Sequence, residues 1–145
     1  MRLRYARLST AGPVRPVNED WLDWWESPDP LTREAQGSVA LLADGVGGYE
    51  HGEVASRLAV DAALKEFQSA PGDTKPYTLL RRMFAAACSQ VHDNAVAGHK
   101  GQRMATTLTA SIFRDAAGKP TKNADGTPAY QMQDGTDKDL SLIHI

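Results

Sequence analysis

Hydrophobic residues along the chain form short apolar runs, typical of strands, and longer stripes with helical spacing. The run Val39–Ala43 is continuous and too short for a helix, so it predicts a buried strand. Looser alternation predicts a first strand over Arg2–Ser9 and a second over Trp21–Glu26. Alternating Thr, Ser and apolar residues predict a further strand over Ala105–Phe113.

Two amphipathic helices are predicted between these strands. The first covers about Glu53–Gln68, and the second begins near Pro76, a favourable first-turn residue, and ends by Gly98. The apolar positions expected to face the core recur every three or four residues. They are Val54, Leu58, Ala62, Val60, Leu64 and Phe67 in the first helix, and Leu80, Met83, Phe84, Ala87, Val91 and Ala95 in the second.

Proline and glycine mark the predicted loops. Pro28 and Pro30 favour a loop over Ser27–Gly37. A long turn-rich hairpin or excursion is expected over Asp115–Asp139, with room for a short strand at Tyr130–Met132.

Composition limits the classes of function. The 145 residues suit one domain, and the net charge of −2 gives no basic footprint for nucleic acid. No apolar run reaches membrane-spanning length and no signal core is visible, so a cytoplasmic protein is expected. The single cysteine, Cys88, excludes an intrachain disulfide and is expected to be a small buried residue of the second helix.

The chemistry concentrates where the Val39–Ala43 run stops. Asp44 and Gly45 follow it at once, and Gly47, Gly48 and Gly52 come before the first helix. Glycines let the backbone approach a ligand closely. An aspartate, a glycine loop and a helix start after a buried strand indicate a site for a cation or a phosphate.

Glu19, Asp20 and Asp44 carry hard oxygen donors that suit magnesium or manganese rather than zinc. If Asp20 lies beside Asp44, two carboxylates about 4 Å apart repel by about 4 kcal/mol at an effective dielectric constant near 20, so a cation or a proton is needed between them. The carbonyl of Gly45 is a candidate neutral ligand. Two ions in such a site would activate a water for attack on phosphorus, and Arg15 is placed to grip the phosphate.

Each feature alone has an ordinary explanation. The Glu19-Asp20 pair reads as a solvated loop, Asp44-Gly45 as a turn, and Arg15 as a surface charge. The glycine-rich loop lacks the Lys-Ser/Thr of a P-loop and the spacing of a dinucleotide fingerprint, which disfavours nucleotide binding.

Three blocks in order resemble the PPM family, the metal-dependent phosphatases of the protein phosphatase 2C type. They are Arg15-x-x-Asn18-Glu19-Asp20, then Ala43-Asp44-Gly45-Val46-Gly47-Gly48 with Gly52-Glu53-Val54-Ala55-Ser56, then Met104-Ala105-Thr106-Thr107-Leu108. The middle block is the most specific. The resemblance covers roughly Leu3–Phe113, the N-terminal half of a family domain.

The resemblance implies an α+β fold, a β-sandwich flanked by helices in four layers (α-β-β-α), of which this chain holds the N-terminal half. It implies hydrolysis of phosphoserine and phosphothreonine in phosphorylated proteins with two Mn²⁺ or Mg²⁺ ions, and a cognate serine/threonine kinase as a partner. By motif position Asp20, Asp44 and Gly45 match metal ligands, Glu19 a supporting acidic position, and Arg15 the phosphate-binding arginine.

Two departures from the family pattern stand out. Ala105 replaces the glycine usual before the paired threonines. The Gly-Asp-Ser-Arg block and the later metal-binding aspartates of the family have no counterpart, and the chain ends about where that block should begin.

We therefore expect residues 1–139 to be the N-terminal portion of a phosphatase domain, inactive when alone. Residues 140–145, Leu-Ser-Leu-Ile-His-Ile, read as a non-native tail, because a common sequencing adapter translates to these residues; the alternative is a genuine strand cut at a boundary. Two other functions stay open: a catalytically silent module of the same fold that binds a partner, and an unrelated metal-binding α/β domain.

Overall fold

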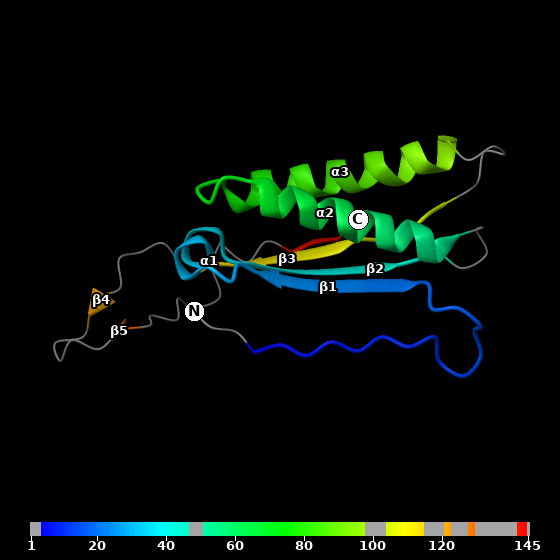
Figure 1. The fold of residues 1–145 in the computed structure, drawn as a ribbon, viewed down its shortest axis with the longest axis horizontal. Helices are drawn as coiled ribbons and strands as arrows, with labels where there is room; N and C mark the ends of the chain where they lie inside the picture. The colour runs from blue at the N-terminus through cyan, green and yellow to red at the C-terminus, as the bar shows by residue number, and fades with distance from the viewer. Residues whose placement is uncertain are drawn as a thin grey trace.

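One antiparallel sheet carries two long helices along one of its faces (Figure 1). The computed structural model describes residues 4–46, 51–97, 104–114, 121–122, 128–129 and 142–144. The sheet has the spatial order β1-β2-β3-β6. Its strands are β1 (Asp20–Glu26), β2 (Ser38–Asp44), β3 (Thr109–Phe113) and β6 (Leu142–His144). The helices are α1 (Pro30–Gln36), α2 (Gly52–Ser69) and α3 (Pro76–Ala97), and β4 (Thr121–Lys122) pairs with β5 (Pro128–Ala129) in a separate two-stranded sheet.

Strand β2 lies in the middle of this arrangement and its two faces differ. Val39, Leu41 and Ala43 are buried and belong to the core, whereas Leu42, between them, keeps 48% of its surface exposed. The strand prediction is confirmed, and Val39, Leu41 and Ala43 pack with residues of α2 and α3 in the core. The described residues thus form one helical layer and one sheet layer, which agrees with the predicted α+β class.

Both predicted helices are present. Of the predicted core positions of α2, Val60 and Phe67 are buried and Leu64 packs against the core. The other three, Val54, Leu58 and Ala62, are only half-buried, because the core face turns toward the residues next to them. The fully buried side chains of this helix are Ala55, Ser56, Ala59, Val60, Ala63 and Phe67. Small residues are preferred there because α2 packs closely against both the sheet and α3.

On α3 the expected core positions Leu80, Met83, Phe84 and Ala87 are buried, together with Leu79. The last two expected positions, Val91 and Ala95, are only half-buried. Cys88 is exposed, so the expectation that it is buried is wrong. No helix in the described part of the chain is long and apolar enough to cross a membrane.

The predicted first strand is absent over residues 4–9, and residues 1–3 lie outside the described part. The segment runs beside β1 and is attached through side chains: Tyr5 stacks on Trp24 with ring centroids 4.7 Å apart, and Arg7 pairs with Asp23. Residues 4–10 are exposed on both sides, so no burial favours a regular ladder. The buried indole N–H of Trp24 has no hydrogen-bond partner among the described residues.

The predicted loop 27–37 contains a helix instead, α1. Asp29 caps it by accepting a hydrogen bond from the backbone N–H of Thr32 at 2.8 Å, and Pro30 occupies the first turn. A proline in a loop suggests a helix breaker, yet proline is also favoured at the first helical position, which Pro30 occupies. The hydrogen bonds from Thr32 lower the pKa of Asp29 below its usual value.

The region 115–139 and the tail 140–145 agree with the sequence predictions in part. The turn-rich region 115–139 contains the small β4–β5 hairpin, whereas the strand suggested at Tyr130–Met132 lies outside the described residues. Within the tail, β6 pairs with β3, so the strand-like composition is confirmed. That this tail is non-native stays a prediction.

Candidate metal and phosphate site

The ends of β1 and β2 bring the two predicted aspartates together. The strands pair antiparallel with Asp20 directly opposite Asp44, at the end of the ladder. The N–H of Gly45 then donates to the carbonyl of Glu19 at 3.1 Å, which continues the pairing by one step. Side chains opposite each other in an antiparallel pair have Cβ atoms roughly 5 Å apart, so these two carboxyl groups are immediate neighbours.

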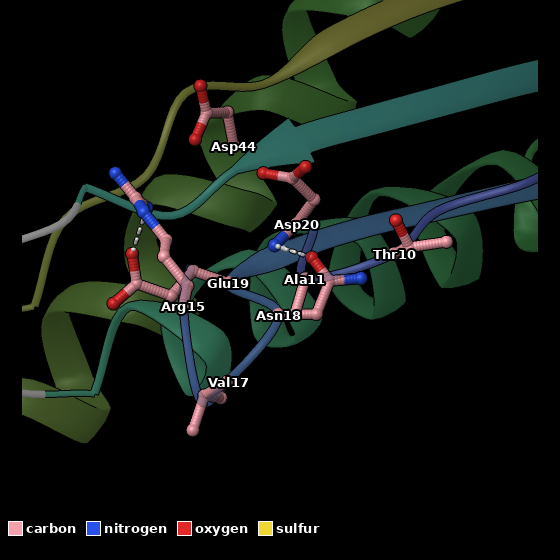
Figure 2. Close-up of a pocket in the computed structure, with 8 residues that line it drawn as sticks. All are labelled: Thr10, Ala11, Arg15, Val17, Asn18, Glu19, Asp20 and Asp44. Atoms are coloured by element: carbon pink, nitrogen blue, oxygen red, sulfur yellow. Dashed lines mark hydrogen bonds and ion pairs between the residues drawn. The ribbon is translucent and has the colours of Figure 1, made fainter. Parts of the chain in front are cut away.

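The same end of the sheet carries a pocket of about 300 Å³. Its walls include Arg15, Asn18, Glu19, Asp20 and Asp44, with Thr10 and Ala11 from the N-terminal segment. Figure 2 shows the carboxyl groups of Asp20 and Asp44 at the ends of their strands, with the Arg15 guanidinium beside them. The structure therefore gathers in one pocket four residues that the sequence nominated separately.

The electrostatics of the pocket are unfavourable for two ionised aspartates. The pKa of Asp20 is raised above its usual value, first by desolvation and next by the negative charge of Asp44. Arg15 acts in the opposite direction and favours the ionised form. A group shared between the two carboxylates, whether a proton or a cation, would relieve this repulsion.

Glu19 lies close to Arg15. Its carboxylate accepts a hydrogen bond from the Arg15 guanidinium at 2.9 Å; the Arg15 side chain is 61% exposed and that of Glu19 only 19%. The Glu19 carboxyl carbon also lies 3.3 Å from where a Cβ on Gly52, the first residue of α2, would stand. Glu19 thus holds Arg15 at the pocket from beside the positive end of the α2 dipole.

Gly45 occupies a position where only glycine fits. A Cβ there would stand 2.5 Å from the carbonyl oxygen of Gly52 and 2.6 Å from that of Glu19. Its backbone is therefore pressed between the start of α2 and the approach to β1. This close contact keeps the Gly45 peptide next to the aspartates, where its carbonyl is a candidate ligand.

Sequence reasoning assigned no role to several residues of the site. The side chain of Asn18 accepts the N–H of Asp20 at 3.2 Å and donates to the Ser9 hydroxyl at 2.7 Å, which fixes the entry into β1. An asparagine two residues before a strand is a known turn signal, so Asn18 could have been found. Thr106 and Thr107 bind the backbone of Asp44, and no spacing rule would have revealed that contact.

The donor set fits a hard divalent cation. Two carboxylates meet at one strand end, and the close-packed Gly45 peptide adds a carbonyl oxygen. Within the described residues, no group of three or more His, Cys, Asp or Glu side chains is placed to hold a metal ion.

Comparisons with known proteins identify the family of this chain. A family model described as protein phosphatase 2C matches residues 17–142. The serine/threonine protein phosphatase PstP of two Mycobacterium tuberculosis strains is 34% identical over 116 residues, 77% of this chain. The crystal structure of the M. tuberculosis phosphatase PstP superposes with a TM-score of 0.59 at 32% identity, over 77% of this chain.

The lengths of these relatives differ from that of this chain. The match covers 19% of the PstP sequence and 42% of the chain in its crystal structure. The family model nevertheless spans most of the 145 residues. The chain belongs to the protein phosphatase 2C family, the PPM type of serine/threonine protein phosphatases.

Proposed function

We propose that this chain is the N-terminal part of a metal-dependent phosphatase that hydrolyses phosphoserine and phosphothreonine in proteins. The observation that carries the proposal is the pairing of Asp20 with Asp44 in a pocket that also holds Arg15. Opposed carboxylates suit divalent cations, and an adjacent arginine suits a phosphate dianion. The family membership and the named relative support the same chemistry.

In this proposal Asp20 and Asp44 hold Mn²⁺ or Mg²⁺, with the Gly45 carbonyl as a third donor, and Asp44 is shared by two ions in the complete domain. Such ions, when bound, supply hydroxide at neutral pH and offset phosphate charge. Arg15 binds two phosphate oxygens through its planar fork and orients the ester. Glu19 supports the site by holding Arg15 in place.

The chain alone is proposed to be inactive. It corresponds to 42% of the PstP chain of known structure, and its described residues supply fewer than three clustered acidic or histidine ligands. The same observation favours the second candidate, a catalytically silent module of this fold that binds a partner. We further propose cytoplasmic action on the products of a cognate serine/threonine kinase, a setting that the single unpaired cysteine supports.

Calorimetric titration of the 145-residue chain with Mn²⁺ tests the metal site. We expect weak binding that Asp44→Asn abolishes, because the substitution removes a charged donor but keeps its shape. Asp61→Asn, on the exposed side of α2, is the matched control and should bind as the unmodified chain does. Tight binding that survives Asp44→Asn would contradict the proposed site.

Activity separates the two candidates. A longer form of the protein that includes the residues following this chain should hydrolyse a phosphothreonine peptide with Mn²⁺, and the 145 residues alone should not. A longer form that binds no Mn²⁺ and shows no turnover would favour the silent module. Turnover by the 145-residue chain itself would show that it holds a complete site.

A further inference from the structure

The third sequence block, Met104–Leu108, meets the metal-site strand directly. The β2–β3 register places Leu42 opposite Thr109, and an isolated bridge joins Gly45 to Thr106. The same register puts Thr107 opposite Asp44. Asp44 therefore lies between Asp20 of β1 and Thr107, which precedes β3.

Threonine hydroxyl groups replace part of the regular ladder at this position. The N–H of Asp44 donates to Thr107 Oγ1 at 3.2 Å. The Asp44 carbonyl accepts from the Thr107 N–H at 2.9 Å and lies 2.9 Å from the donating Thr106 hydroxyl. That hydroxyl is also 3.0 Å from the Thr107 carbonyl, so it is shared between two acceptors. Both backbone polar groups of Asp44 are thus held by the threonine pair.

This arrangement explains why β3 begins at Thr109 and not at Ala105, as the sequence predicted. Side chains that bond to nearby backbone groups compete with ladder hydrogen bonds. The segment stays attached through the Val46 N–H, which donates to the Ala105 carbonyl at 3.0 Å. The irregular stretch therefore flanks the predicted ligands, and its threonines contact one of them.

We infer that Thr106 and Thr107 are positioning residues whose hydroxyl groups hold the Asp44 peptide, so that its carboxylate stays beside Asp20 for cation binding. The inference rests on the proposed function for its cation. The carboxylates of Asp20 and Asp44 lie opposite each other and repel. Because Asp44 is the last residue of β2, few other contacts restrain its position. Hydrogen bonds to both the N–H and the carbonyl of Asp44 limit rotation of the backbone that carries its carboxylate. Groups behind a ligand commonly change metal affinity by about tenfold or more.

The experiment compares hydroxyl loss with hydroxyl retention in the 145-residue chain. Thr107→Val and Thr106→Val keep the branched shape and remove the hydroxyl, whereas Thr107→Ser keeps the hydroxyl. Thr78→Val, on the exposed face of α3, is the matched control. Mn²⁺ affinity is measured by titration, and the exchange rate of the Asp44 amide hydrogen is measured by NMR without metal.

We expect Thr107→Val to weaken Mn²⁺ binding by about tenfold and Thr106→Val by a similar or smaller factor, with Thr107→Ser and Thr78→Val within about twofold of the unmodified chain. Amide exchange at Asp44 should accelerate in Thr107→Val and recover in Thr107→Ser. A residue that only supports the fold would shift the unfolding midpoint without this serine rescue of affinity.

Equal Mn²⁺ affinity in Thr107→Val and the unmodified chain would overturn the inference, as would a serine variant as weak as the valine variant. If the unmodified chain binds no Mn²⁺, the proposed metal site fails, and amide exchange alone then decides. Unchanged Asp44 exchange in Thr107→Val would show that the hydroxyl does not hold this peptide, and faster exchange would support its positioning role.

Discussion

The two ends of the β1–β2 pair are built on opposite principles. At the acidic end, defined by Asp20 and Asp44, two carboxyl groups face each other across the strands. At the opposite end, which we call the anchored end, Gln36, Gly37 and Arg114 donate hydrogen bonds to backbone carbonyl groups. The buried amide of Gln36 donates to the carbonyls of Phe67 at 2.5 Å and Ala70 at 3.3 Å.

Arg114 completes the anchored end. Its guanidinium donates to the Gln36 carbonyl at 2.9 Å and to the Thr74 carbonyl at 2.6 Å, which joins β3, α1 and the α2–α3 loop. Burial lowers the pKa of Arg114 and Asp73 opposes that shift, so even here a charge is buried at a cost. At the anchored end, donors bind backbone carbonyls near the C-terminus of α2. At the acidic end, two carboxyl groups repel each other unless a proton or a cation lies between them. Substitutions should therefore affect stability at the anchored end and binding at the acidic end.

The largest effect on stability is expected from Gly37→Ala. Gly37 has φ +80° and ψ −156°, a region that glycine alone adopts readily, and a Cβ would stand 2.2 Å from the Phe113 carbonyl oxygen. We expect a loss of about 3 kcal/mol or more in the free energy of unfolding, measured by urea denaturation. Gly12→Ala is the control, because its φ of +69° is also positive but nothing lies within 4 Å. A similar small loss at both positions would show that β3 does not press on Gly37.

Gln36→Leu is expected to cost less, about 1–3 kcal/mol, because the carbonyls of Phe67 and Ala70 lose a buried donor. Gln68→Leu changes the same residue type at an exposed position of α2 and should be nearly neutral. Thermal unfolding measures both variants, and Mn²⁺ titration of the folded Gln36→Leu chain should match that of the unmodified chain. Weaker Mn²⁺ binding would mean that the two ends are coupled.

The two ends also differ in how far the sequence predicts them. The acidic end was predictable because its residues are short-range signals: an apolar run that stops at Asp44, and an acidic pair before Trp21. Antiparallel strands of similar length then bring those ends together. Their roles as ligands stay predictions, but their placement follows from pattern alone.

The anchored end was not predictable, because its contacts join residues far apart in the chain. Gln36 meets Phe67, and Arg114 meets Gln36 and Thr74, by tertiary packing that leaves no periodic signal. The same reason hides the threonine contacts with Asp44. Local sequence signals also conflict at Pro30, because proline breaks a helix in its interior but favours a helix at its first residue. The hydrogen bond that caps the helix at Asp29 favours the helix here.

Asp20→Asn tests the acidic end and should change stability slightly in the opposite direction. Because the pKa of Asp20 is raised in the folded chain, its ionisation disfavours folding above that pKa, and the penalty vanishes as the pH falls through it. Without metal at pH 7 we expect the variant to unfold at a slightly higher temperature, with no gain near pH 3, and to lose Mn²⁺ binding. Asp61→Asn should show neither change. A lower unfolding temperature at pH 7 would mean that the Asp20 carboxylate stabilises the fold.

Arg15→Lys should have the smallest effect on stability. The Arg15–Glu19 pair is exposed on the arginine side, and exposed ion pairs contribute about 0–1 kcal/mol, so the unfolding temperature should stay within error. Binding of inorganic phosphate in the presence of Mn²⁺ should nevertheless weaken about fivefold, because lysine keeps the charge but cannot present two parallel donors. Arg57→Lys, a similarly exposed arginine that lies over the Trp21 ring, is the matched control for charge and should leave the phosphate titration unchanged. If Arg15→Lys and Arg57→Lys bind phosphate equally well, Arg15 contributes only charge to the pocket, and the planar fork proposed for phosphate recognition is wrong.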